Sequence, residues 1–478
     1  MFNGISIQGG KTVWSMADNF AQQALSFVIF AILARWLTPH EFGLLAIAHL
    51  MVQFSRLAVL DAMAMPVVRS VGTDDSLFDW LFTLCTSVSA ILSGLMAMSS
   101  SLLANFFEAP DLTPVLLGMS LVILLFGLSR AHEARLLRDG NFRLLAIRSI
   151  SSVSIGGVVA MYLAFQGKGA LALVAQQITT TTIGLIIAVI SEWKIWRPKL
   201  KWSMVLVRQH ASEMGKVGSA GILNYANNSG DTALVSILLG PGATGLYNLA
   251  KRILSAAFLI VGASLSRVSI SIFIKQQSDI EALGNTFKRF LNLILLLLVP
   301  IYAITTILAE PLVVIIFGEQ WRSSAPLFVW MSLIYLCQAV FGLGQSLCFS
   351  TGESKLPPKL ALMQLCISCG AAVLFTNWYG VTGIAIGFSA GSIIGMSMMV
   401  VAISRQLNLP LLNILTTSMP ALLSGFISII VIYILEFSGL NVINWKTLII
   451  ASIVGVVTYS LSTGFFIIGQ KISKRYFH

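Results

Sequence analysis

Hydrophobic segments of about twenty residues follow one another along almost the whole chain. This pattern constrains the fold, because a helix that crosses the hydrocarbon core of a bilayer needs about 20 mostly apolar residues. Charged residues make up only 10% of the 478 residues, whereas a soluble domain usually carries about 25%. A soluble protein of this length could not cover its surface with so few charges. Lipid must therefore surround most of this chain. We therefore expect an all-α integral membrane protein.

The apolar segments predict about fourteen transmembrane helices. Their expected ranges are 13–36, 42–65, 78–104, 112–131, 144–166, 169–191, 215–239, 243–267, 287–309, 325–349, 357–377, 380–404, 412–435 and 447–468. The first range contains Asp18 and Gln22, which the core of a signal peptide would not carry, so it is interpreted as a mature span. Trp193, Trp196 and Trp202 lie near span ends, which is typical of an aromatic belt at the membrane interface.

Lysine and arginine residues concentrate in alternate predicted loops. The densest loops are those assigned Arg130 to Arg148 and residues 192–216. Positively charged loops tend to stay in the cytoplasm, so we expect a bacterial inner-membrane protein with both termini in the cytoplasm. This topology also explains the net charge of +11 without a nucleic-acid partner. The opposite loops are too short to house a catalytic site, so we expect that the protein is not an enzyme.

Two hairpins of the chain resemble each other. ARWLTPHEFGLLAIA (residues 34–48) aligns with SILLGPGATGLYNLA (residues 236–250), so that Pro39 and Gly43 match Pro241 and Gly245 at one constant interval. Any short helical hairpin favours Pro and Gly, but the interval also equals six predicted helices. The repeat predicts two six-helix bundles of the same orientation. The expected division is an N-terminal bundle (1–191), a cytoplasmic linker (192–214), a C-terminal bundle (215–404), and two further helices with a cytoplasmic tail (405–478).

The strings ILARWLTPHEFGLLAIA and NSGDTALVSILLGPGATGLYNLAKRI, together with two six-helix bundles and two extra helices, resemble a known transporter superfamily. It is the multidrug/oligosaccharidyl-lipid/polysaccharide exporter superfamily, and the strings are similar to its polysaccharide branch. That branch contains the Wzx-type flippases of lipid-linked O-antigen, colanic acid and teichuronic acid repeat units. The resemblance implies a transporter that works by alternating access.

Polar side chains form stripes on two predicted spans that match in the repeat. The first carries Asp18 and Gln22, and the seventh carries Asn224, Asn227, Asn228 and Asp231. Polar residues inside a bilayer usually face a cavity or a partner, so the stripes favour a water-filled cleft, although hydrogen bonding between packed helices is an alternative. Within this cleft, Asp18 and Asp231 are candidates for binding a coupling cation, either a proton or sodium.

Three basic residues are assigned to the interior of predicted spans: Arg56, Lys251 and Arg252. Lys251 and Arg252 could instead extend to the membrane interface, and Arg56 could pair with Asp18 or Asp61. A cationic cavity would suit a pyrophosphate, because arginine offers paired donors to phosphate oxygens and lysine adds a point charge. These three cations, with the polar residues Gln22, Asn224, Asn227 and Asn228, are the candidate substrate-binding residues.

No cofactor or metal is expected. The Cys366-x-x-Cys369 pair lacks a second pair or a nearby histidine, so it is interpreted as ordinary packing in a membrane helix. The chain contains no G-x-x-x-x-G-K-[ST] loop, so ATP is not expected to be the energy source.

Two functions remain in competition. The first is a flippase for a polyprenyl-pyrophosphate-linked oligosaccharide repeat unit, embedded in membrane lipid and serving surface polysaccharide biosynthesis, with a polysaccharide polymerase as a possible partner. The second is a cation-coupled drug or metabolite antiporter of the same superfamily, which would share the fold. A carrier of drug cations would favour an acidic cavity, so the basic residues favour the flippase.

Overall fold

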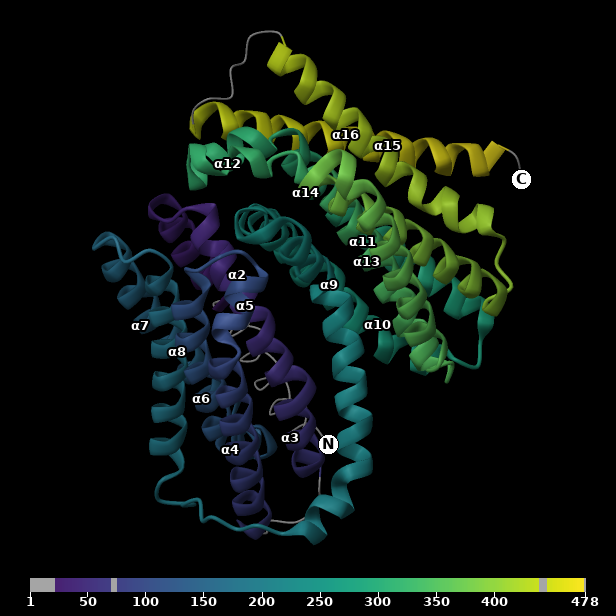
Figure 1. The fold of residues 1–478 in the computed structure, drawn as a ribbon. Coiled ribbons are helices and arrows are strands. Elements are labelled where there is room, and N and C mark those ends of the chain that lie inside the picture. The colour runs from purple at the N-terminus through teal and green to yellow at the C-terminus, as the bar shows by residue number, and fades with distance from the viewer. Residues whose placement is uncertain (1–21, 70–74, 438–444, 477–478) are drawn as a thin grey trace. The chain divides into compact units, whose positions relative to one another are not determined.

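The computed structural model describes residues 22–69, 75–437 and 445–476, and in these ranges the regular secondary structure is entirely helical (Figure 1). The chain folds into two compact units, residues 1–245 and 246–478. Unit 1 contains a helix over Gln22–Trp36, α2 (Pro39–Phe54), η1 (Ser55–Leu60), α3 (Asp61–Arg69), α4 (Asp75–Met98), α5 (Ser100–Phe106), α6 (Leu112–Arg138), α7 (Phe142–Phe165), α8 (Ala170–Glu192) and most of α9 (Met204–Ala257).

Unit 2 begins within α9. It continues with η2 (Phe258–Gly262), α10 (Ala263–Gln276), α11 (Ile280–Ile307), α12 (Ala309–Phe317), η3 (Glu319–Ser324), α13 (Leu327–Ser350), α14 (Leu356–Gln406), α15 (Leu411–Phe437) and α16 (Trp445–Tyr476). In this unit α11 packs against both α13 and α15, and α13 packs against α14. The short helices α12 and η3 occupy a stretch that the sequence interpretation leaves as a loop. The division into six-helix bundles at 1–191 and 215–404 stays a prediction.

The described helices agree with the predicted number of spans. Eleven are long and apolar enough to cross a membrane. Two of these each consist of two helices joined at a kink, at Gly240 (φ 74°) and at Gly380 (φ 55°), where a left-handed backbone favours glycine. Counting each as two spans gives thirteen, and the shorter apolar helix Gln22–Trp36, which adjoins undescribed residues, matches the remaining one. The fold is therefore an all-α, multi-pass membrane fold.

A capping box fixes the start of α2. The backbone N–H of Glu41 donates to the Thr38 hydroxyl at 3.3 Å, and the N–H of Thr38 donates to the Glu41 carboxylate at 2.6 Å. These bonds satisfy donors that the first turn of a helix leaves unpaired, and Pro39 has no such donor to lose. The chain therefore turns sharply from the helix Gln22–Trp36 into α2.

The two hairpins of the predicted repeat meet within unit 1. A Cβ atom added to Gly43 would overlap the carbonyl oxygen of Pro241, and one added to Gly245 would overlap the carbonyl oxygen of Pro39. The contact is therefore reciprocal, with each glycine admitting the backbone of the other hairpin. A reciprocal contact between matching positions supports the predicted repeat.

A pair of π-helical segments gives the repeat a second structural signature. Counting on from η1 by the interval that separates Pro39 from Pro241 leads to η2, so both matching spans widen at the same point. Such π segments interrupt the regular hydrogen-bond ladder and occur frequently at functional sites.

Helix α6 lies at the centre of unit 1, in contact with α2, α3, α4, α7 and α8. Its apolar side chains Leu116, Met119 and Ile123 are fully buried with Ile47 of α2 and Val174 of α8. Contrary to the predicted end near residue 131, α6 continues to Arg138. The last two turns of α6 are helical, but their charged side chains give them the low hydropathy that is typical of a loop. This extension places charged groups of α6 beside the polar site described next.

Candidate functional site

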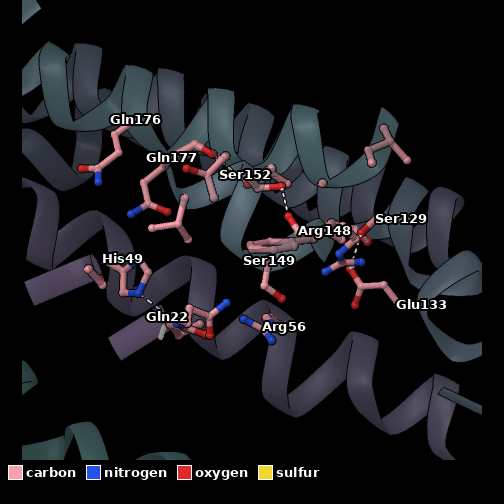
Figure 2. A pocket seen from close by; sticks show the side chains of 18 of the residues that line it. Gln22, His49, Arg56, Ser129, Glu133, Arg148, Ser149, Ser152, Gln176 and Gln177 are labelled. Atoms are coloured by element: carbon pink, nitrogen blue, oxygen red, sulfur yellow. Dashed lines mark hydrogen bonds and ion pairs between the residues drawn. The ribbon is translucent and has the colours of Figure 1, made fainter. Parts of the chain in front are cut away.

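A polar cavity of about 470 Å³ lies inside unit 1, among the helix Gln22–Trp36, α2, η1, α6, α7 and α8 (Figure 2). Amide, hydroxyl and imidazole groups dominate its lining. These groups belong to Gln22, Gln23, Ser26, His49, Gln53, Ser129, Ser149, Ser152, Gln176, Gln177, Thr180 and Thr181. So many uncharged donors and acceptors at the core of a membrane-spanning unit can replace the water around a polar ligand.

One face of the α2–η1 span supplies the first wall of the cavity. His49, Gln53 and Arg56 follow one another at helical spacing, and all three line the cavity. The amide Nε2 of Gln53 lies 2.9 Å from the imidazole Nε2 of His49. Figure 2 shows His49, Arg56 and Gln22 facing the polar residues of α7 and α8 across the cavity. Of these three residues, the sequence analysis named Arg56 as a candidate substrate-binding residue.

An ionic network supplies the second wall. The Glu133 carboxylate lies 2.8 Å from Arg130 Nη1 and 2.8 Å from Arg148 Nη1, and it accepts a hydrogen bond from the Ser129 hydroxyl at 3.0 Å. Arg130 also lies 2.8 Å from Asp61. Each of these ionised side chains is at most 20% exposed, and buried charges of this kind require such partners. The network joins α3, α6 and α7.

Arg56 differs from the other two arginines of the site. Its guanidinium carbon lies 5.2 Å from the centre of the Phe126 ring, a cation–π distance. Among the described residues, none forms an ion pair with Arg56 within 4 Å, and the candidate partner Asp61 is paired with Arg130. Among the described residues of this network, three arginines with two carboxylates leave one positive charge in excess, and Arg56 is the arginine without an ion pair.

The structure brings together only part of the predicted site. Arg56 and Gln22 both line the cavity, whereas the three asparagines lie on α9 and are not among the lining residues. Asn227 Nδ2 donates to the Leu223 carbonyl at 3.0 Å, and Asn228 Nδ2 donates to the Asn224 carbonyl at 2.9 Å. These amides therefore make hydrogen bonds along their own helix.

The other predicted residues lie elsewhere. Asp231 is buried in α9, where its carboxylate accepts from the backbone N–H of Thr232 at 2.7 Å. Lys251 and Arg252 belong to unit 2, and the Lys251 carbonyl accepts from the Tyr335 hydroxyl at 3.4 Å. Asp18 lies outside the described residues.

The sequence interpretation missed Arg130, Glu133 and Arg148. It counted both arginines among the charges of a cytoplasmic loop, although they fall at the ends of the predicted ranges 112–131 and 144–166. The structure places both within helices, and Arg148 lines the cavity. The spacing of Ser129, Arg130 and Glu133 was the available signal, since residues three and four apart share one face of a helix. For a metal ion, the ranges 22–69, 75–437 and 445–476 contain no cluster of three or more His, Cys, Asp or Glu side chains that could bind it.

Comparison with known proteins places the chain in a family. A family model described as "Polysaccharide biosynthesis protein" matches residues 32–326. The chain is 22% identical over 383 residues to "Lipopolysaccharide biosynthesis protein WzxC" of Escherichia coli (strain K12), covering 80% of this chain and 77% of that protein. It is 29% identical over 327 residues to "Succinoglycan biosynthesis transport protein ExoT" of Rhizobium meliloti (strain 1021), covering 67% of this chain and 64% of that protein.

Two solved structures share the fold. "Lipid II flippase MurJ, inward closed conformation" superposes with a TM-score of 0.77 at 16% identity, covering 95% of this chain and 98% of that chain. An inward-facing "multidrug resistance MATE family transporter of the MOP superfamily" superposes with a TM-score of 0.61 at 13% identity, covering 82% and 98%. These structural likenesses concern the fold alone. Because the family model matches more than half of the sequence, the chain belongs to the polysaccharide biosynthesis protein family.

Proposed function

We propose that the protein is a transporter that flips a polyprenyl-pyrophosphate-linked oligosaccharide repeat unit across the bacterial inner membrane. The transported unit would serve surface polysaccharide biosynthesis, as the names of the relatives WzxC and ExoT indicate for those proteins. The fold shared with a lipid II flippase supports this function. Transport proceeds by alternating access, without an enzymatic step on the substrate.

The observation that carries the proposal is the polar cavity of unit 1 with its one excess positive charge. A flippase must shelter a sugar-pyrophosphate head from hydrocarbon, while the polyprenyl tail remains in lipid. Moving a phosphate charge into hydrocarbon without compensating donors is prohibitive. Arg56 offers the phosphate paired N–H donors, and the amides and hydroxyls of the other lining residues suit sugar hydroxyls. The volume of about 470 Å³ falls within the range of ordinary ligand sites.

The Glu133 network favours Arg56 as the proposed binding cation. Arg130 and Arg148 already have carboxylate partners at 2.8 Å, so a ligand phosphate would have to compete with those carboxylates for them. Arg56 contacts the face of Phe126 at cation–π distance and forms no ion pair within 4 Å with another described residue. A phosphate that approaches Arg56 therefore gains a charge partner without breaking an ion pair between the described residues.

A cation-coupled drug or metabolite antiporter is the second candidate, because the chain shares its fold with a multidrug transporter. The two functions require cavities of opposite charge. A cationic drug would be repelled by Arg56 and would need a carboxylate that is not already paired. The excess positive charge therefore favours the lipid-linked oligosaccharide.

The remaining features of the proposed cycle extend this function. The alternation of charged loops supports cytoplasmic termini. Asp231, buried in α9, is the described candidate for coupling transport to a proton or sodium gradient, and Lys251 and Arg252 are proposed to contribute further positive charge to the substrate path. A polysaccharide polymerase would receive the flipped unit.

The experiment is complementation of a deletion strain with Arg56→Ala. Loss of one charge-assisted hydrogen bond costs about 1.5–3 kcal/mol, so we expect surface polysaccharide to fall about tenfold or more while protein level in the membrane stays near normal. Lipid-linked glycan should accumulate inside the cell. Arg143→Ala is the matched control, because Arg143 is an exposed arginine of the same unit outside the cavity. Normal surface polysaccharide with Arg56→Ala would overturn the proposed role of the cavity.

A further inference from the structure

The connection between α8 and α9, residues 193–203, is pinned to the end of unit 1. The indole Nε1 of Trp196 and the backbone N–H of Lys199 both donate to the Asp79 carboxylate, at 2.9 Å and 3.0 Å. The backbone N–H of Lys201 donates to the Thr83 hydroxyl at 2.8 Å. Trp196 is also buried against His132, with ring centres 4.9 Å apart. These contacts hold the connection against α4.

The outer side of this connection is unusually apolar. Six large hydrophobic side chains in and just after it are more than half exposed: Trp193, Ile195, Leu200, Trp202, Met204 and Val205. Leu200 is 82% exposed and Trp202 is 59% exposed. Trp193 and Trp202 are exposed, as an aromatic belt requires, whereas Trp196 is buried.

The same segment is strongly basic. Lys194, Arg197, Lys199, Lys201 and Arg208 are all exposed, and no acidic residue occurs between residues 193 and 212. The hydrogen bonds of Lys199 and Lys201 to α4 use backbone atoms, so their ammonium groups stay available. A cluster of cations beside exposed apolar side chains is the pattern of a segment that lies at a membrane surface.

The position of the connection identifies what covers it. Both α8 and α9 are long and apolar enough to span a membrane, so the short segment that joins them lies at the membrane surface. Tryptophan prefers the headgroup level there, and lysine and arginine are attracted to anionic lipids. A zwitterionic headgroup would satisfy the apolar side chains but not the unbalanced positive charge.

We propose that residues 193–208 form a binding site for anionic phospholipid headgroups of the leaflet at which they lie. The apolar side chains enter the boundary between headgroups and acyl chains, and the five cations contact lipid phosphates. Because the connection is bonded to Asp79 and Thr83 of α4, lipid bound there stabilises the fold of unit 1 by linkage. This site is separate from the cavity and does not depend on what the protein transports.

Native mass spectrometry of the purified full-length protein tests the proposal. The wild-type protein is mixed with phosphatidylglycerol, phosphatidylcholine or a polyprenyl phosphate, and retained lipid is counted. Each lysine or arginine near an anionic surface contributes about fivefold in affinity. We therefore expect the variant with Lys194, Arg197, Lys199 and Lys201 changed to Gln to lose more than about tenfold in phosphatidylglycerol retention, and phosphatidylcholine retention to stay unchanged.

The control variant removes four exposed cations elsewhere, at Arg267, Lys355, Lys359 and Arg405. It has the same net charge as the test variant and should retain phosphatidylglycerol as the wild type does. Thermal unfolding in the presence of phosphatidylglycerol should show stabilisation of the wild type and the control, and less of the test variant. Equal losses in both variants, or a loss that affects only polyprenyl phosphate, would overturn the proposal.

Discussion

The matching spans of units 1 and 2 widen into a π-helical segment at the same point, but their side chains differ in chemistry. Arg56 in η1 and Glu133 in α6 both line the cavity of unit 1. The interval that separates Pro39 from Pro241 leads from these positions to Phe258, the first residue of η2, and to Tyr335 of α13. The two aromatic rings lie 5.9 Å apart. An ionic site in one unit thus corresponds to an aromatic contact in the other.

Two tyrosine hydroxyls of unit 2 show the structural role of the aromatic residues there. Tyr302 donates to the Leu254 carbonyl at 3.1 Å, and Tyr335 donates to the Lys251 carbonyl at 3.4 Å. These bonds satisfy backbone groups of the span just before η2, so the tyrosines act in packing. In unit 1 the position that matches Tyr335 carries Glu133, which borders the cavity. The matching segments therefore share a backbone feature, whereas the proposed binding residues lie in unit 1.

The largest expected difference between the two units is in stability. Glu133→Ala leaves Arg130 and Arg148 without their shared carboxylate, and breaking a buried ion pair in this way costs about 3–5 kcal/mol. Tyr335→Phe, at the matching position, removes one long hydrogen bond and should cost only about 0.5–1.5 kcal/mol. Thermal unfolding of the purified variants measures both. Equal destabilisation would show that Tyr335 contributes as much to stability as the ionic network does, which would contradict the expected difference.

The reciprocal hairpin contact predicts a smaller effect that is the same at both matching positions. Gly43→Ala and Gly245→Ala each place a methyl group against a proline carbonyl of the other hairpin, and such overpacking costs about 1–3 kcal/mol. Gly242→Ala is the control, because nothing lies within 4 Å of a Cβ atom added there. The measurement is again thermal unfolding. A strong effect at only one of the two glycines would contradict the reciprocity.

The smallest expected effect concerns an uncharged lining residue. Gln53→Ala removes neutral hydrogen-bonding groups from the cavity wall, which is worth about 0.5–1.5 kcal/mol, or about two- to tenfold in substrate affinity. Ser255→Ala changes the matching position of unit 2, where the hydroxyl donates to the Arg252 carbonyl, and should leave affinity unchanged. Retention of lipid-linked oligosaccharide by each purified variant provides the comparison. A greater loss with Ser255→Ala would place binding in unit 2.

The sequence predicted the spans well because lipid imposes a simple rule on each segment separately. An apolar run of about 20 residues must form a helix, so even the two spans joined at Gly380 could be separated. Arg56 could be named as a candidate site residue from the same pattern, since a charge deep in an apolar run requires a partner or a cavity.

The ionic wall of the cavity could not be predicted in this way. Arg130 and Arg148 lie near the ends of apolar runs, where positive charge is also the signature of a cytoplasmic loop. Only the packing of α6 against α3 and α7 brings both arginines to Glu133 and Asp61. The asparagines of α9 show the converse limit, because a polar stripe can satisfy itself along its own helix.

The most direct test of the central claim is the affinity of the purified protein for its lipid-linked oligosaccharide, measured by native mass spectrometry for Arg56→Ala, Arg56→Lys and the control Arg143→Ala. We predict that Arg56→Ala binds about ten- to a hundredfold more weakly, which corresponds to about 1.5–3 kcal/mol for a hydrogen bond to a charged group. Arg56→Lys should recover only part of this loss, because lysine lacks the paired donors of arginine. Wild-type affinity in Arg56→Ala would contradict the claim that the excess charge of the unit 1 cavity binds the substrate.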